Sequence, residues 1–403
     1  MYIKRTMAKK KQKMAQAEPN QGTEVSKTTE PIADSKSKKK LIWLDHLRSQ
    51  IRRRKVQVGA GVVLLVLIAG IVGAVVWQSK QTADGNQGNT QGTNKNNETA
   101  EVPLTAPRKI DGIMVATSDA NNVPACVMIE NAAFSGVRPQ SGLSAASVVY
   151  EVIVEGGITR LMAVYAGEQA DPVGPVRSAR DTYLEFASEY NCAYVHAGGS
   201  YTAMNAIPQL SLRDIDGLRE SKWFWRDNTK VSPHNLFTNT GNLYEAVSQG
   251  HSWTDAPTYQ TWKFVNTDLV PPGEAATQVN IRFGGSYNVT YDYNPEGNYY
   301  ERSNTGVAHT DANTGKTLTT RNIIIQHVPA GEFIEGKGRV NFSVTGEGTV
   351  EIIRQGVVTK GIWKKTGRLD RTLFYAEDCQ EIPLTRGNTW IEIVPDGYSV
   401  DWQ

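Results

Sequence analysis

The chain has 403 residues, a formal net charge of +2 at pH 7 and only three cysteines. So few cysteines exclude a protein held together by a disulfide framework, while the length allows a tail, a membrane anchor and about two domains. The small net charge conceals an asymmetry, because residues 1–55 hold 16 Lys and Arg against 5 Asp and Glu, whereas residues 56–403 hold 27 against 36. We therefore expect the two ends of the chain to face different surroundings, and we expect no nucleic-acid partner for the acidic part.

A long uncharged run of Val, Leu, Ile, Ala and Gly occupies residues 56–78. At about 1.5 Å per residue, a helix of this length crosses a hydrocarbon layer of about 30 Å. A secretory signal peptide would lie nearer the N-terminus with a shorter apolar region, and no neighbouring segment could bury the run as a core helix. Basic residues 52–55 precede it, so the positive-inside rule leaves the N-terminus in the cytoplasm. The sequence predicts a single-pass transmembrane helix, with everything after Trp77 outside.

Polar segments flank the predicted transmembrane helix on both sides. Residues 1–55 have too few apolar residues to fold alone and predict a disordered, basic cytoplasmic tail. Its lysine runs could contact nucleic acid, but lysines this close to a membrane favour anionic lipid headgroups. Residues 79–107 are rich in Asn, Gln, Gly and Thr, which is the composition of a flexible linker.

The first extracytoplasmic domain is predicted over residues 108–252, with strands and helices intermixed. Three apolar runs predict strands at residues 125–129, 147–154 and 158–166. Gly156 and Gly157, between the last two runs, can adopt the positive φ angles that a hairpin turn needs.

A helix, a strand, a Gly-rich turn and a second helix are predicted in the middle of this domain. Aromatic and apolar residues spaced as on one helix face follow Ser178, which together with Asp181 resembles a capping box. A strand is predicted at residues 192–195, and a second helix near Tyr201. Residues 212–217 are predicted to form a turn dense in carboxylates.

The second extracytoplasmic domain is predicted over residues 253–403 and is mainly β. A Trp- and Pro-rich connector at 253–272 marks the change, after which apolar residues alternate with polar ones in short runs separated by Gly, Asn and Asp. This pattern is typical of an antiparallel sheet, sandwich or barrel. The predicted fold class is therefore α+β, with a mixed α/β domain followed by a mainly antiparallel β domain and with helices concentrated between Ser178 and Gln249.

The three cysteines are Cys126, Cys192 and Cys379, and their odd number leaves at least one unpaired. Cys192 lies in an apolar strand pattern, so a buried core residue is favoured there over a nucleophile. The sequence does not indicate whether any two of them pair.

A candidate anion site is predicted where Arg177 and Arg180 precede the first helix and where Gly198, Gly199 and Ser200 precede the second. Helix N-termini present free backbone N–H groups, and the guanidinium fork suits carboxylate or phosphate. Arg226 and Asn235 are added as further binding candidates from later loops. The structural alternative is that these arginines form internal salt bridges with Asp181, Asp214 or Asp216.

A catalytic alternative uses the two histidines in motif-like stretches, His196 and His234. Either could act as a general base beside a carboxylate such as Asp181, although each could equally be a histidine hydrogen-bonded at a strand end. Ser200 is a possible nucleophile, but the G-x-S-x-G frame is missing. No H-x-x-x-H or C-x-x-C spacing supports a metal site, and no cofactor is predicted.

Several motifs together resemble the YerB-like family of bacterial envelope proteins. In the first domain these are GPVRSAR at 174–180, HAGGS at 196–200, DIDG at 214–217 and PHNL at 233–236; in the second they are YDY at 291–293, YER at 300–302, NIIIQ at 322–326 and GIWK at 361–364. The resemblance spans about residues 106–395. It implies a two-domain protein outside the membrane whose biochemical function is unassigned, so no catalytic residue is carried over. Members of this family are often lipoproteins held by an N-terminal cysteine, whereas here the predicted transmembrane helix takes that place.

Two functions remain open from the sequence. The first is a module that binds an anionic cell-envelope polymer or a partner protein, with Trp223, Phe224, Trp225 and Tyr201 as stacking surface. The second is an envelope-remodelling hydrolase or transferase that uses a His–carboxylate pair. In either case we expect Arg180, His196 and Ser200 to line one cleft, with His234 and Asn235 entering from an opposite loop.

Overall fold

The computed structural model describes residues 104–134, 136–255, 257–266, 270–336 and 338–403. The predicted tail at 1–55, the transmembrane helix at 56–78 and nearly all of the linker at 79–107 lie outside these residues. Every described residue belongs to one compact unit, which spans Ala100–Gln403. Within the described ranges, no helix combines the length and the apolar character needed to cross a membrane.

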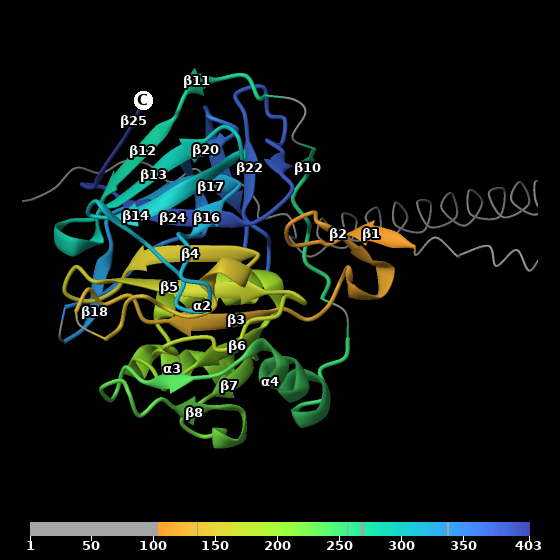
Figure 1. Cartoon of the computed structure of the whole chain (residues 1–403), viewed down its shortest axis with the longest axis vertical. Helices are drawn as coiled ribbons and strands as arrows, with labels where there is room; N and C mark the ends of the chain where they lie inside the picture. The colour runs from red at the N-terminus through yellow and green to blue at the C-terminus, as the bar shows by residue number, and fades with distance from the viewer. Residues whose placement is uncertain (1–103, 135, 256, 267–269, 337) are drawn as a thin grey trace, which may run out of the picture. The chain divides into compact units, whose positions relative to one another are not determined.

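A mixed eleven-stranded sheet forms the centre of the described unit (Figure 1). Its path runs β11 (Glu274–Ala275), β21 (Val357–Lys365), β20 (Gly346–Arg354), β17 (Asn322–Val328), β24 (Thr389–Pro395), β4 (Val148–Ile153), β5 (Thr159–Tyr165), β3 (Ala125–Ile129), β6 (Ala193–His196) and β7 (Arg213–Asp216), with β22 (Leu373–Tyr375) on β21. Strands β3, β4, β5 and β24 are buried along their whole length. A strand that is buried along its whole length needs a nearly continuous run of apolar residues. Such runs are the reason that the sequence predicts β3, β4 and β5.

Smaller sheets surround the central one. A six-stranded sheet contains β12 (Gln278–Arg282), β13 (Val289–Asn294), β14 (Tyr299–Asn304), β15 (Val307–Ala308), β16 (Thr319–Thr320) and β25 (Ser399–Trp402). Four strand pairs complete the set: β1 (Thr105–Pro107) with β2 (Met114–Ala116), β8 (Trp225–Arg226) with β9 (Leu236–Phe237), β10 (Phe264–Val265) with β23 (Leu384–Thr385), and β18 (Glu332–Glu335) with β19 (Arg339–Asn341). The six-stranded sheet is antiparallel throughout.

The α-helices are α2 (Asp181–Tyr190), α3 (Tyr201–Gln209) and α4 (Thr240–Glu245), and α4 continues into the π-helical turn η4 (Ala246–Gly250). Short 3₁₀ turns are η1 (Thr117–Asp119), η2 (Leu143–Ala145), η3 (Ser221–Trp223) and η5 (Gly285–Tyr287). Helix α2 packs on the central sheet, where Phe186 stacks on Tyr150 of β4 with ring centroids 4.4 Å apart. The helices of the described residues therefore lie between Ser178 and Gly250, as predicted.

The two halves of the sequence meet at a parallel pairing of β24 with β4, in which Thr389 faces Val148 and Glu392 faces Glu151. The central sheet consequently runs without interruption through both predicted domains. Strand β24 is also parallel to β17, so the second half is not antiparallel throughout. Parallel strands need no hairpin between them, and for that reason the short-range turn signals could not indicate this pairing.

A buried ionic cluster fastens the six-stranded sheet to the central one. Arg302 of β14 forms a salt bridge with Glu151 of β4 and lies 3.9 Å from Glu392 of β24. Tyr291 of β13 donates to Glu392 at 2.5 Å. Burial and the nearby charge of Glu151 raise the pKa of Glu392, whereas burial and the charge of Arg302 hold the pKa of His309 well below its usual range.

Two local predictions were wrong in detail. Residues 213–216 form strand β7 rather than a turn, because Ile215 is fully buried and the segment extends the sheet parallel to β6. Helix α2 begins at Asp181 without a side-chain cap, and the Ser178 hydroxyl donates to Ala197 O instead.

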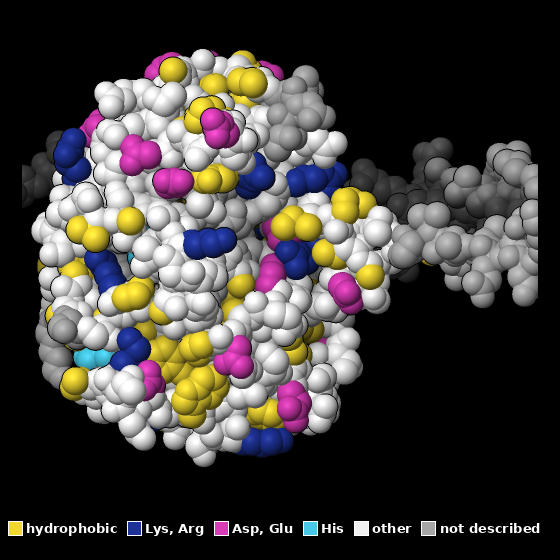
Figure 2. Space-filling model, viewed as in Figure 1, with side chains coloured by type: hydrophobic (Ala, Val, Ile, Leu, Met, Phe, Trp, Pro, Cys, Tyr) yellow, Lys and Arg dark blue, Asp and Glu magenta, His cyan; other side chains and the backbone are white. Residues whose placement is uncertain are grey.

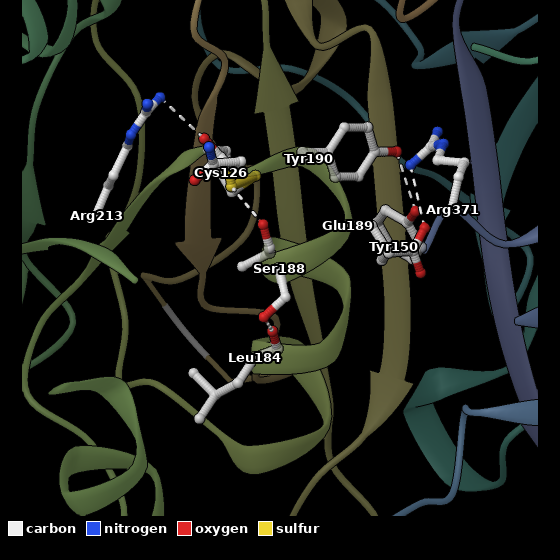
Figure 3. The surroundings of a disulfide bond; sticks show 11 residues. Cys126, Tyr150, Leu184, Ser188, Glu189, Tyr190, Arg213 and Arg371 are labelled. Carbon is white, nitrogen blue, oxygen red and sulfur yellow. Dashed lines mark hydrogen bonds and ion pairs between the residues drawn. A yellow bond between two sulfur atoms is a disulfide. The ribbon is translucent and has the colours of Figure 1, made fainter. Parts of the chain in front are cut away.

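A disulfide joins Cys126 of β3 to Cys192, one residue before β6, with the Cα atoms 5.9 Å apart (Figure 3). Both cysteines are fully buried, as expected for Cys192, while Cys379 is exposed and free. The pairing that the sequence left open is thus one disulfide between two of the three cysteines. The bond fixes two adjacent parallel strands that are separated by 66 residues of sequence.

Removing this disulfide should destabilise the protein. We expect the Cys126→Ala/Cys192→Ala variant to lose about 2–5 kcal/mol of unfolding free energy, because the unfolded chain regains the freedom of a long closed loop. Urea unfolding of the full chain, followed by tryptophan fluorescence, measures the change. Cys379→Ser is the control and should unfold as the wild type does; an unshifted midpoint for the double variant would refute the stabilising role.

Candidate functional site

A charged cluster lies beyond the carboxyl end of β3, at Glu130. Arg177 Nε approaches Glu130 Oε2 at 2.5 Å, His234 Nδ1 approaches the same oxygen at 3.2 Å, and Arg160 Nη2 lies 3.7 Å from Glu130 Oε1. Four segments distant in sequence thus contribute one side chain each. We call Glu130, Arg160, Arg177 and His234, together with Glu155 and Arg180 described below, the Glu130 cluster.

Backbone hydrogen bonds hold the segment that carries Arg177 between two strands. Arg177 N donates to Met128 O of β3 at 2.8 Å, and Val176 N donates to Leu236 O of β9 at 2.7 Å. Gly174 adopts a φ of 149°, and a Cβ there would lie 2.8 Å from the Phe237 ring. Only glycine fits this close approach, so the GPVR motif serves to lay Arg177 beside Glu130.

A second carboxylate, Glu155 in the β4–β5 turn, extends the cluster. Arg180 donates through Nε to Glu155 Oε2 at 2.7 Å and through Nη2 to Oε1 at 2.5 Å. Arg160 Nη2 also donates to Glu155 Oε1, at 3.2 Å. Arg180, which was predicted to bind a ligand, therefore uses its guanidinium group for an internal bidentate salt bridge. Its partner is a glutamate rather than any of the three aspartates considered.

The cluster holds three guanidinium groups against two carboxylates, and this excess of positive charge appears in its pKa values. Burial alone would raise the pKa of Glu130, but Arg160 and Arg177 outweigh it and lower that pKa. Burial and the charge of Arg177 lower the pKa of His234, so its ring is neutral at pH 7.

Three side chains of the cluster are partly exposed: Glu155 at 24%, Arg177 at 22% and His234 at 18%. Arg177 and His234 lie together against Glu130 and form one accessible edge of the cluster. Phe134, itself exposed, sets its ring edge against His234 with centroids 4.7 Å apart. Lys230 lies nearby in sequence and donates to Gly136 O at 2.9 Å. This edge offers a cation, a neutral imidazole and an aromatic ring to solvent.

The two predicted helix N-termini do approach each other, and Asp181 is the anion between them. Asp181 opens α2, and its Oδ2 accepts from Ser200 Oγ at 2.9 Å and from Thr202 Oγ1 at 2.8 Å at the start of α3. Ser200 also caps α3 by accepting from Ala203 N. The protein's own carboxylate thus takes the place where the sequence predicted an external anion, and the Ser200 hydroxyl is committed to structure.

His196 is fully buried, with both ring nitrogens facing acceptors. Nε2 lies 2.6 Å from Asp214 Oδ1 and Nδ1 lies 2.9 Å from Gly198 O. Both ring nitrogens are therefore occupied by groups of the protein itself. Gly198 N in turn donates to Asp216 at 2.9 Å. This group fixes the 196–200 turn and leaves no ring nitrogen free for proton transfer.

The remaining candidates lie elsewhere. Arg226 and Asn235 pair with each other at 2.7 Å beside the β8–β9 strands. Trp223 and Phe224 are buried core residues, so of the four predicted stacking residues only Trp225 and Tyr201 are exposed. Gly199 packs its backbone against Met204 and Ala179. These contacts divide the residues predicted to line one cleft among several polar groups.

Three members of the cluster, Glu130, Glu155 and Arg160, were not predicted from the sequence. The sequence pattern places Arg160 in an apolar strand and Glu155 in a hairpin turn. A lone arginine inside a fully buried strand is a signal that could have been used, because a buried charge requires a partner. Its partner Glu130 could not be identified from the sequence, since Glu130 lies 30 residues earlier, just after another strand.

Two family models match the chain over most of the described region: the N-terminal domain of a protein of unknown function (DUF3048) at residues 111–253, and the corresponding C-terminal domain at 279–391. The chain is also 30% identical over 304 residues to "Putative lipoprotein YerB" of Bacillus subtilis (strain 168), covering 73% of this chain and 89% of that protein. The chain belongs to the YerB-like DUF3048 family. The crystal structure of Bacillus subtilis YerB matches with a TM-score of 0.65 at 28% identity, covering 74% of this chain and 99% of the other. The resemblance read from the sequence motifs is confirmed.

The Glu155–Arg180 pair should make the stability of this YerB-like protein sensitive to acid. Burial alone would raise the pKa of Glu155 from its ordinary 4.5, but hydrogen bonds and charge from Arg180 and Arg160 lower it to about 2. A lowered folded-state pKa stabilises the fold above pH 4.5, and this contribution is lost as pH falls through about 2. We expect Glu155→Gln to cost on the order of 2–3 kcal/mol at pH 7 and progressively less towards pH 2.

Urea unfolding of the full chain at pH 7, 4 and 2 measures this difference. Glu347→Gln is the matched control, because Glu347 is 68% exposed in its pair with Lys364. A Glu155→Gln deficit of equal size at pH 2 and pH 7 would contradict the assignment.

Proposed function

We propose that this protein is a membrane-anchored, extracytoplasmic member of the YerB-like family that binds an anionic cell-envelope polymer or partner at the Arg177–His234 edge. One observation carries the proposal: three arginines of the Glu130 cluster share two carboxylates, and the arginine at its accessible edge is Arg177. A ligand phosphate or carboxylate would supply the missing negative charge. Arginine suits this task because its fork can bond Glu130 and still present N–H donors outward.

The distribution of surface charge supports a local interaction rather than a broad electrostatic one. On the face drawn in Figure 2, Lys and Arg side chains are interspersed with Asp and Glu, and hydrophobic side chains gather on its lower part. A field of mixed sign attracts no polyanion over long distances. Recognition would then depend on the contacts at the edge of the cluster, with Phe134 as an adjacent apolar surface.

Two observations support the extracytoplasmic placement. The buried Cys126–Cys192 disulfide is of a kind that persists in oxidising surroundings outside the cytoplasm. The Bacillus subtilis relative is named as a lipoprotein, which is a membrane-attached class of protein. In this chain we assign the attachment to the apolar run at 56–78, which follows the basic residues 52–55.

The proposed topology predicts the outcome of proteolysis on intact cells. Protease added outside should remove the part after Ser79 and spare the N-terminal tail, because the tail lies behind the membrane. Antibodies against tags at each end of the full-length chain report which part survives, and detergent-lysed cells are the control in which both ends are digested. A digested tail with a protected C-terminal tag would reverse the topology.

The binding proposal predicts the effect of removing the exposed arginine. Arg177→Ala should weaken the affinity of the full-length protein for poly(glycerol phosphate) about tenfold, the cost of one charge-assisted contact of about 1.4 kcal/mol, and should reduce its salt dependence. Calorimetric titration at two salt concentrations measures both effects. The matched control is Arg282→Ala, since Arg282 is 57% exposed in a surface pair with Asp401. Equal losses for both variants, or none for Arg177→Ala, would overturn the proposal.

The alternative, an envelope-remodelling hydrolase or transferase, is favoured by one feature of the same cluster. His234 is a partly exposed, neutral histidine with Nδ1 against the Glu130 carboxylate, which is the orientation of a general base. Purified cell-wall sacculi incubated with the full-length protein separate the two functions. Soluble fragments that disappear with His234→Gln would indicate an enzyme, whereas binding without release supports the proposal.

A further inference from the structure

A separate cavity of about 690 Å³ lies away from the Glu130 cluster. Its walls come from η1 and the turn after it, from the loop that follows β5, and from α4, η4 and the start of the connector. Its volume falls within the range of about 300–1,000 Å³ that small-molecule sites occupy. None of the residues considered from the sequence as catalytic or binding candidates lines it.

The cavity walls carry hydrogen-bonding groups with almost no charge. Side-chain amides come from Asn121, Asn122 and Gln169, and hydroxyls from Ser and Thr residues of the same walls. The single ionisable acid among its lining residues, Asp119, already accepts a hydrogen bond from Ser118 at 3.0 Å. Amides both donate and accept, so these walls suit a neutral ligand rich in hydroxyl or amide groups rather than an ion.

An aromatic side chain of the cavity is held in a fixed position. Trp253 stacks on His251 with centroids 4.2 Å apart and an interplanar angle of 9°. Its backbone N–H donates to Val247 O at 2.8 Å, which ties the chain after the π-helical turn back onto η4. Tyr244 is fixed as well, because its hydroxyl accepts from Gly167 N at 2.7 Å and donates to Glu168 O at 3.3 Å. A rigid indole beside polar groups can pack on an apolar ligand face without further ordering.

One polar atom of the wall is left without a partner. Asn121 Oδ1 is buried and has no hydrogen-bond donor among the described residues. This oxygen has almost no accessible surface, so it faces the interior of the wall and makes no contact with a ligand in the cavity.

We infer that this cavity binds a neutral sugar unit. The apolar face of a pyranose ring packs on Trp253, and its hydroxyls bond the amides of Asn122 and Gln169. This inference goes beyond the proposed function, because it concerns another surface and a ligand of the opposite electrostatic character.

Calorimetric titration of the full-length protein with chitotetraose, a neutral oligomer of N-acetylglucosamine, tests the inference. We expect saturable binding that Trp253→Ala weakens at least tenfold and Gln169→Ala weakens about threefold to fivefold. Gln169 is exposed, so its truncation tests the site even if the tryptophan variant fails to fold. The matched controls are Trp402→Ala and Gln249→Ala, which change the same residue types outside the cavity wall and should bind as the wild type does.

Three results would overturn the inference: no binding by the wild type, equal losses in the control variants, or undiminished binding by both cavity variants. Titration with sorbitol, an acyclic polyol, separates ring stacking from simple hydroxyl binding. Sorbitol binding as tight as chitotetraose binding would also reject the sugar assignment. These outcomes are independent of poly(glycerol phosphate) binding, so they leave the proposed function unaffected.

Discussion

The fold depends on a buried salt bridge between Glu151 of β4 and Arg302 of β14, which joins residues 151 positions apart. Both side chains are almost fully removed from water, a state that costs several kcal/mol per ion unless hydrogen bonds replace the lost hydration. Here they are replaced: Thr159 Oγ1 and Asn131 Nδ2 donate to Glu151 Oε1 at 2.5 and 3.1 Å, and the Arg302 guanidinium lies over the Trp390 ring. Removing one partner would leave the other charged and buried, so this pair sets how the two sheets pack.

The same network reaches the candidate site through neighbouring residues. Asn131, a donor to Glu151, directly follows Glu130, which binds Arg177 and His234. The side-chain amide of Gln140 donates through Nε2 to both Glu130 O and Asn131 Oδ1. Its Oε1 accepts from His309 Nε2, beside Arg302. The exposed edge is therefore the outer end of a polar network that begins in the core. Such support preorganises a charged group for a ligand, because the side chain has already lost its conformational entropy on folding.

Two surfaces of different chemistry follow from this arrangement. The Glu130 cluster has an excess of positive charge at a partly exposed arginine, whereas the cavity beside Trp253 is lined by neutral amides and hydroxyls. Envelope polymers combine sugar rings with anionic groups, so one extended ligand could contact both kinds of surface. In contrast, the cluster around Glu189 and Arg371 near the disulfide is internal, because Arg371 is stacked between Tyr190 and Trp262 and salt-bridged to Glu189 (Figure 3). It joins α2 to the segment before β22 and offers no accessible charge of its own.

The sequence by itself determined the family, the α+β class and most strand positions, because apolar periodicity and short Gly-rich turns are local properties of the chain. It also indicated that Arg177 belongs to a charged site. Only the tertiary structure decided that Arg180 pairs with Glu155, that Asp181 occupies the space between two helix starts, and that Cys126 bonds Cys192. Each of these contacts joins residues at least 19 positions apart, and partners at such separations are chosen by the packing of strands and helices, which no local pattern records.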